Sequence, residues 1–139
     1  MHDSYSGANF NPGLRHFDGQ KALAFARDRH TLARGDIDRS VNQGRLMLAA
    51  LTKLQKVFDD DPSKLFDWIS VGWRNTSSDL DVATIVDLGL TAAQIPPSKV
   101  VNTVVPASGG TVGSQSVVFI SSSASSLYRD MKADGIIGS

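Results

Sequence analysis

The sequence predicts an α/β fold with several helices and a small number of strands, and three observations support this prediction. Met47, Leu51, Leu54 and Phe58 recur at spacings of four, three and four, and Ile37, Val41 and Leu48 extend the apolar side, which indicates one long amphipathic helix. Two runs rich in β-branched residues, Val100–Val105 and Ser116–Ile120, indicate strands joined by a hairpin-like connection. After these strands, Ser121–Asp134 is expected to close the fold as a further helix.

The N-terminal part of the chain is predicted to be a loop followed by two helices. Residues 1–17 are rich in turn formers and show no sustained periodicity, which predicts a loop. Asp18 is suited to cap the N-terminus of a short helix around Ala22–Ala26. After a polar, irregular stretch, the long helix follows from Asp36, so the segment 18–58 holds both helices.

The segment 62–139 contains the remaining predicted elements. A proline at the first turn and four apolar residues after it predict a helix over Pro62–Trp73. Another helix is expected at Leu80–Leu90. The two strands follow, with a glycine-rich turn at Gly109–Gly113 between them, and the closing helix leaves a short tail, Gly135–Ser139.

The composition limits the classes of function that the chain can have. Its 139 residues suit one domain or part of a larger one, and 41% hydrophobic with 20% charged residues is typical of a globular protein. Fourteen basic residues balance fourteen acidic ones, which argues against a general nucleic-acid binder. The absence of cysteine excludes disulfides and thiol catalysis. No apolar run approaches the roughly 20 residues that cross a bilayer, and the first residues do not resemble a signal peptide.

The long helix is predicted to carry a polar face opposite its apolar stripe. Arg39 and Gln43 are four residues apart, so they share one side of the helix. The apolar stripe of Met47, Leu51 and Leu54 lies largely on the other side and is expected to face the core. The polar face of the helix can therefore line a cleft.

Arginines cluster just before and within this helix, and their spacing predicts an anion-binding site. Arg27 and Arg29 are two residues apart, so both project to one side if that stretch is extended. Guanidinium groups offer paired donors that match phosphate oxygens and stay charged at any working pH. Together with Arg39, they suit a pyrophosphate better than a single carboxylate. Spacing alone leaves open the alternative that the arginines pair with Asp28, Asp36 and Asp38 on a solvated surface.

Three segments together form a longer and more specific pattern. They are Phe17–His30, Gly35–Arg39 and Asn42–Gln43. In combination they resemble the C-terminal signature of the LytR-CpsA-Psr family, in which LDG-x-x-ALAY-x-R-x-R is followed, after a short loop, by GD-x-x-R-x-x-RQ. The stretch from Tyr5 to Phe17 also resembles the approach to this signature in actinobacterial members.

The resemblance implies a fold, an activity and a set of site residues. The fold would be the αβα sandwich of this family, here only its C-terminal part. The activity would be that of a phosphotransferase, which binds a polyprenyl-pyrophosphate-linked glycan and moves the glycan, with one phosphate, to peptidoglycan. Arg29, Asp36 and Arg39 would be catalytic, with Asp36 either orienting the arginines and capping the helix or activating the acceptor hydroxyl. The residues that would contact the pyrophosphate are Arg27, Arg29, Arg39 and Gln43.

The sequence departs from the family pattern at two positions and lacks part of the expected domain. Asn42 stands where many relatives have an arginine, and Gly44 where a second glutamine is frequent, so the anion site would hold one charge fewer. Magnesium is implied as the cofactor, with its aspartate ligands expected in an N-terminal half that nothing here corresponds to. Asp3 is a poor substitute for them. The resemblance thus implies an extracytoplasmic domain of a membrane-anchored parent, inactive without its other half.

Two alternatives remain beside the enzyme. The same arginines would also suit a non-catalytic module that binds anionic cell-wall polymers or lipid pyrophosphate, with salt-sensitive binding and no turnover. A structural unit whose exposed sheet edge pairs with a second copy is the other alternative. Because a half-domain buries less area than its parent, we expect the isolated chain to self-associate or to be only moderately stable.

Overall fold

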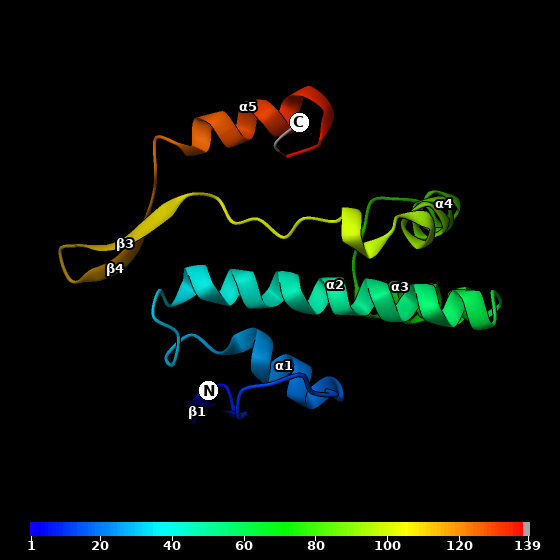
Figure 1. Ribbon diagram of the computed structural model, residues 1–139, viewed down its shortest axis with the longest axis horizontal. Coiled ribbons are helices and arrows are strands. Elements are labelled where there is room, and N and C mark those ends of the chain that lie inside the picture. Colours follow the sequence, from blue (N-terminus) through cyan, green and yellow to red (C-terminus); the bar gives the residue numbers. More distant parts are fainter. Residues whose placement is uncertain (138–139) are drawn as a thin grey trace. The chain divides into compact units, whose positions relative to one another are not determined.

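The computed structural model describes residues 1–137, and their elements confirm the predicted α/β class (Figure 1). Five α-helices and two antiparallel two-stranded sheets are consistent with part of the sandwich that the resemblance implies. The chain divides into two compact units, Met1–Leu46 with the described part of Val101–Ser139, and Met47–Val100. In chain order the elements are β1 (His2–Asp3), β2 (Ala8–Asn9), α1 (Gly19–Arg27), α2 (Asp36–Asp60), α3 (Lys64–Asn75), α4 (Val82–Gln94), the 3₁₀ turn η1 (Pro97–Lys99), β3 (Ala107–Val112), β4 (Gln115–Ile120) and α5 (Ala124–Asp134).

The first helix forms as the sequence predicts. The Asp18 side chain accepts a hydrogen bond from the Lys21 backbone N–H at 2.8 Å and caps α1, whose other end is closed by the Asp28 N–H donating to the Ala24 carbonyl oxygen. The hydrogen bonds from Lys21 lower the pKa of Asp18, in keeping with a charged cap. The loop predicted before it contains one small sheet. β1 and β2 pair around a turn in which Gly7 has a φ of 75°, and strands of two residues are too short to show a periodicity.

The second sheet is shifted from its predicted position. Val100–Val105 forms no strand, which makes that prediction wrong, and β3 begins only after Pro106. The glycines at 109 and 110, predicted as a turn, lie inside β3, and the reversal comes at Gly113, with a φ of 61°. The reason is packing: the Phe119 ring covers Gly110, where a Cβ atom would lie 2.6 Å from it. Strand glycines are favoured under such a ring.

The second unit consists of the later part of α2 with α3 and α4. Just before α3, the Asp61 side chain accepts hydrogen bonds from the Ser63 N–H and hydroxyl. Asp81 caps α4 by accepting from the Thr84 N–H at 2.7 Å. α3 packs on α4 at Gly89, where a Cβ atom would lie in ordinary van der Waals contact with Ile69, at 3.6 Å. Both predicted helices are therefore present, with ends shifted by two to four residues.

Few large apolar side chains are buried. Within residues 1–137, the hydrophobic residues that are almost fully covered are Ala8, Ile37, Leu65 and Ala124. Met47, predicted to face a core, is 74% exposed, so the expectation for that position is wrong, while Leu51 and Leu54 are half-buried. None of the helices described here has the length and apolar character that crossing a bilayer requires.

Candidate anion-binding site

A cavity of about 260 Å³ lies where the first sheet, the end of α1 and the start of α2 meet, and we call it the small cavity. All four residues predicted to contact pyrophosphate line it, although they come from two separate segments of the chain. The structure thus brings them together around one concavity. Its full lining is Tyr5, Ser6, Ala26, Arg27, Arg29, His30, Arg39 and Gln43.

The local backbone explains how Arg27 and Arg29 come to share this cavity. α1 ends at Arg27, and Asp28 adopts extended dihedral angles, with φ −62° and ψ 132°. The Asp28 side chain is fully buried and accepts hydrogen bonds from the Thr31 hydroxyl at 2.5 Å and the Thr31 N–H at 3.4 Å. Since neighbouring side chains of an extended segment point to opposite sides, burial of Asp28 directs the arginines on either side of it outward.

A hydrogen bond between α1 and α2 fixes the other half of the site. The Gln43 side-chain amide donates to the Ala26 carbonyl oxygen at 3.1 Å, so it ties the last turn of α1 to the second turn of α2. Because Arg39 lies one turn before Gln43, the same bond holds Arg39 beside the two arginines of the connection. Gln43 therefore positions the site with one amide hydrogen, and the second has no acceptor among residues 1–137 and can bind a ligand.

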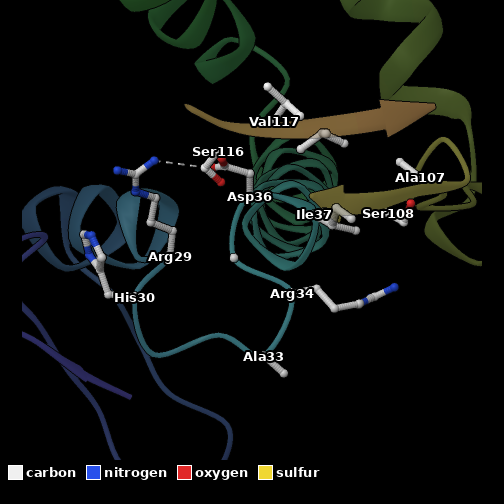
Figure 2. A pocket seen from close by; sticks show the side chains of 13 residues that line it. Arg29, His30, Ala33, Arg34, Asp36, Ile37, Ala107, Ser108, Ser116 and Val117 are labelled. Atoms are coloured by element: carbon white, nitrogen blue, oxygen red, sulfur yellow. Dashed lines mark ion pairs between the residues drawn. The ribbon is translucent and has the colours of Figure 1, made fainter. Parts of the chain in front are cut away.

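Asp36 joins two of the arginines. Its Oδ1 atom lies 3.1 Å from Arg39 Nη1 and 3.8 Å from Arg29 Nη1, and Figure 2 shows Arg29 reaching toward it. This geometry fits the interpretation that Asp36 orients the arginines. The alternative, in which the arginines pair separately with carboxylates on the surface, describes Arg34, which pairs with Asp38 at 2.6 Å. It does not describe Arg29 and Arg39, which share one carboxylate.

The small cavity has more positive charge and more donors than its neighbours satisfy. Two of its three guanidinium groups, those of Arg29 and Arg39, share the single Asp36 carboxylate, and no acidic group within residues 1–137 lies within 4.0 Å of Arg27. The Arg39 Nε atom is buried and has no hydrogen-bond acceptor in the described part of the chain. Buried polar atoms are nearly always satisfied, and the neighbouring Asp36 Oδ1 atom also lacks a hydrogen-bond partner in the described residues, so a ligand or water that both donates and accepts would complete this part of the site.

A larger cavity of about 610 Å³ adjoins the first, and we call it the large cavity. It is lined by the start of α2, including Gly35 and Asp36, and by the facing strands β3 and β4 (Figure 2). The residues at the helix start, Gly35, Asp36 and Ile37, line this second space and not the small cavity. Arg29 and His30 line both cavities and so lie at the boundary between them.

Sequence reasoning missed a polar cluster beside the small cavity. Asp3 is 5% exposed, accepts from the Tyr5 N–H at 3.0 Å and lies 3.3 Å from His30 Nδ1. Burial raises the pKa of Asp3, but its hydrogen bonds with Tyr5, Ser6, His30 and Asp28 outweigh it and lower the pKa from an ordinary 3.8 to about 2. The signal that could have found it is Asp3 two residues before Tyr5, the spacing of an Asx turn.

The two departures from the family pattern have structural explanations. Asn42 is buried and accepts from Arg45 Nη1 at 3.1 Å, so it does not line the small cavity. At Gly44, any Cβ atom would overlap the side chain of Asn102, which donates to the Val41 carbonyl oxygen at 2.9 Å. Glycine at 44 therefore leaves the space that the Asn102 side chain occupies where the segment before β3 approaches α2.

The described residues do not fit a magnesium site. Magnesium prefers several oxygen ligands in octahedral geometry. Across residues 1–137, no group of three or more His, Cys, Asp or Glu side chains is placed to hold a metal ion. The carboxylate nearest the arginines, that of Asp36, is held by Arg29 and Arg39, and Asp3 is engaged by backbone and His30.

Comparison with known proteins identifies the class of protein that these features define. The sequence pattern of the LytR-CpsA-Psr family matches residues 1–133, and the chain belongs to this family. It is 32% identical over 105 residues to the cell wall biosynthesis protein LcpA of Corynebacterium glutamicum. That alignment covers 68% of this chain but 20% of LcpA, so the chain spans about a fifth of this relative's length. No solved structure matches the chain significantly.

Proposed function

We propose that this chain forms the pyrophosphate-binding part of a phosphotransferase of cell-wall assembly. The donor would be a polyprenyl-pyrophosphate-linked glycan, and the glycan with one phosphate would pass to peptidoglycan. The family and the name of its relative LcpA support a role in the cell wall. The observation that carries the proposal is the small cavity, where Arg27, Arg29 and Arg39 converge and the Arg39 Nε donor lacks a partner within residues 1–137.

The chemistry of the reaction explains why three guanidinium groups are needed. Phosphoryl transfer is accelerated mainly by positioning the reactants and by stabilising charge on the equatorial and leaving oxygens. A pyrophosphate diester carries two negative charges, and the leaving polyprenyl phosphate gains a further one as its bond breaks. Arg39, preset by Asp36, and Arg27, which has no acidic partner in the described chain, offer donors on both phosphates.

The remaining parts of the proposed enzyme lie outside the geometry of this chain. Magnesium, if used, would take its ligands from other segments of the whole polypeptide, and it would supply additional charge neutralisation. The proposed place of action is the outer face of the cell membrane, where peptidoglycan is assembled, with anchoring through the parent protein.

Binding tests the anion site directly. Arg39→Ala should weaken binding of inorganic pyrophosphate to the 139-residue chain by about 10- to 100-fold, because hydrogen bonds to charged groups contribute about 1.5–3 kcal/mol. Isothermal titration calorimetry at fixed ionic strength measures this. Arg74→Ala is the matched control, because Arg74 is exposed on α3 and donates to the Ser70 carbonyl oxygen, far along the chain from the site. Equal affinities for the two variants would refute the site.

Turnover separates the enzyme from a binding module. The whole polypeptide that carries this sequence is incubated with a polyprenyl-pyrophosphate-linked glycan and peptidoglycan, and release of polyprenyl phosphate is measured. Transfer that disappears in Arg29→Ala supports the phosphotransferase. Binding of the donor without any transfer would instead establish a non-catalytic module for lipid pyrophosphate.

A further inference from the structure

A histidine and a buried aspartate form a pair at the edge of the small cavity, outside the set of residues discussed so far. His30 Nδ1 lies 3.3 Å from Asp3 Oδ2. The Asp3 side chain is 2% exposed, whereas that of His30 is 44% exposed. One edge of the imidazole therefore faces the protein interior, and the other faces the open side where the two cavities meet.

The aspartate is held in its ionised form and in a fixed direction. Its Oδ1 atom accepts from the Tyr5 N–H at 3.0 Å, which leaves Oδ2 directed at His30. An ionised carboxylate can only accept, so the histidine nitrogen that faces it must carry the hydrogen. In the neutral ring the lone pair then resides on Nε2, for which no hydrogen-bond partner exists among residues 1–137.

A second contact restrains the ring. The aromatic rings of Tyr5 and His30 have centroids 4.5 Å apart at an angle of 37°. Such stacking limits rotation of the imidazole about its side-chain bonds. Tyr5 comes from the same turn that positions Asp3, so one short segment fixes both the tautomer and the orientation of His30.

We infer that His30 is the general base that takes the proton from the acceptor hydroxyl, and that Asp3 is a positioning residue that presents Nε2 to it. This inference rests on the proposed function. The donor pyrophosphate would occupy the small cavity, beside Arg27 and Arg39, and the acceptor sugar would occupy the large cavity. The volume of the large cavity, about 610 Å³, is in the range that binds small ligands.

The proposed step balances without any further reactant. The acceptor hydroxyl oxygen forms a bond to the phosphorus that carries the glycan, and its proton passes to His30 Nε2. The bond from this phosphorus to the bridging oxygen breaks, and polyprenyl phosphate leaves with the electron pair. The imidazolium afterwards releases its proton to solvent, through its exposed edge.

Several charged and titratable groups surround His30. The first sheet and its turn contribute a carboxylate and a phenol, and the large-cavity residues of β3 and β4 contribute no charge within the described chain. The titratable and charged groups that line the two cavities with His30, or that contact it or Asp3, are Asp3, Tyr5, Arg27, Asp28, Arg29, Arg34, Asp36 and Arg39.

The test uses His30→Gln in the whole polypeptide, because glutamine keeps the polar bulk of histidine but cannot accept a proton. Transfer should fall by about 100-fold or more, while affinity for inorganic pyrophosphate is retained. The wild-type rate should decline at acidic pH, because a general base acts only in its unprotonated form, and this decline should be absent in the variant. His16→Gln is the matched control, since His16 is exposed and lines neither cavity.

A second pair of variants distinguishes catalysis from structure. His30→Ala should recover part of its activity when free imidazole is added, which a purely structural role would not allow. Asp3→Asn should reduce transfer by a smaller factor and should change the ratio of the two His30 tautomers, measured by ¹⁵N NMR of the ring.

The outcomes distinguish failure of the His30 inference from failure of the proposed function. If wild-type protein binds and transfers, and His30→Gln keeps the wild-type rate and pH profile, the inference is overturned and the phosphotransferase stands. If His30→Gln loses pyrophosphate binding together with transfer, His30 is a binding residue and the inference is also overturned. If wild-type protein transfers nothing, the proposed function fails and the inference with it.

Discussion

The small cavity and the β3–β4 hairpin are stabilised in different ways. Around the cavity, side chains bond to nearby backbone or to each other: Gln43 to Ala26, Asp28 to Thr31 and Asp3 to Tyr5. The hairpin instead exposes apolar side chains, among them Val118 at 47% and Ile120 at 65%. The arginine site is thus ordered by local polar contacts, whereas the hairpin presents a surface suited to covering by other protein.

The first prediction disrupts the contact between α2 and the segment before β3. Gly44→Ala would drive a methyl group into the Asn102 side chain, which donates to the Val41 carbonyl oxygen. We expect a loss of about 1–3 kcal/mol in the free energy of unfolding, the usual cost of forcing extra volume into a packed contact. Chemical denaturation of the chain measures it. Gly72→Ala is the control, because nothing lies within 4 Å of the Cβ position at Gly72; equal effects would contradict the close approach at residue 44.

The second prediction sharpens the role of Asp36. If its carboxylate orients Arg29 and Arg39, Asp36→Ala should weaken pyrophosphate binding by about 3- to 10-fold, a loss of roughly 1 kcal/mol. A purely electrostatic view predicts the opposite, because a negative charge next to the anion is removed. Titration calorimetry at two salt concentrations distinguishes them. Tighter binding by the variant would show that Asp36 competes with the ligand.

The third prediction concerns the hairpin and should leave the site untouched. Both strands of the two-stranded sheet are edge strands, and a lysine on an edge hinders pairing with another chain. Ile120→Lys should therefore reduce self-association of the isolated chain, with a change in folding free energy within about 0.5 kcal/mol. Sedimentation velocity across a concentration series measures the association, and Tyr128→Lys on α5 tests whether the effect belongs to the strand. A wild-type chain that stays monomeric throughout would contradict the expectation.

The comparison also shows what could be predicted from sequence. α1 and α2 were predictable because the capping residue of α1 and the apolar period of α2 are local signals. The spacing of Arg27 and Arg29 correctly predicted that both side chains lie on one side, because Asp28 between them is buried. The roles of the arginines stay a prediction until binding is measured. β3 was misplaced because its glycines are explained by Phe119, a residue on the opposite strand.

Other features were beyond sequence reasoning for a related reason. The approach of Asp3 to His30 joins residues 27 positions apart, and no spacing rule links them. Met47 was expected in a core because periodicity reveals a helix face but not what lies against it. Local chemistry was therefore easier to predict than contacts between distant segments.

The hydrogen bond from Gln43 to the Ala26 carbonyl oxygen has an evolutionary consequence. It fastens the end of one helix to the next without help from the exposed residues Ala33 and Arg34 that lie between them. These two exposed positions can therefore change in sequence while the guanidinium groups keep their spacing. Related chains could in this way alter the large cavity, which Ala33 and Arg34 line, and leave the donor-binding small cavity unchanged.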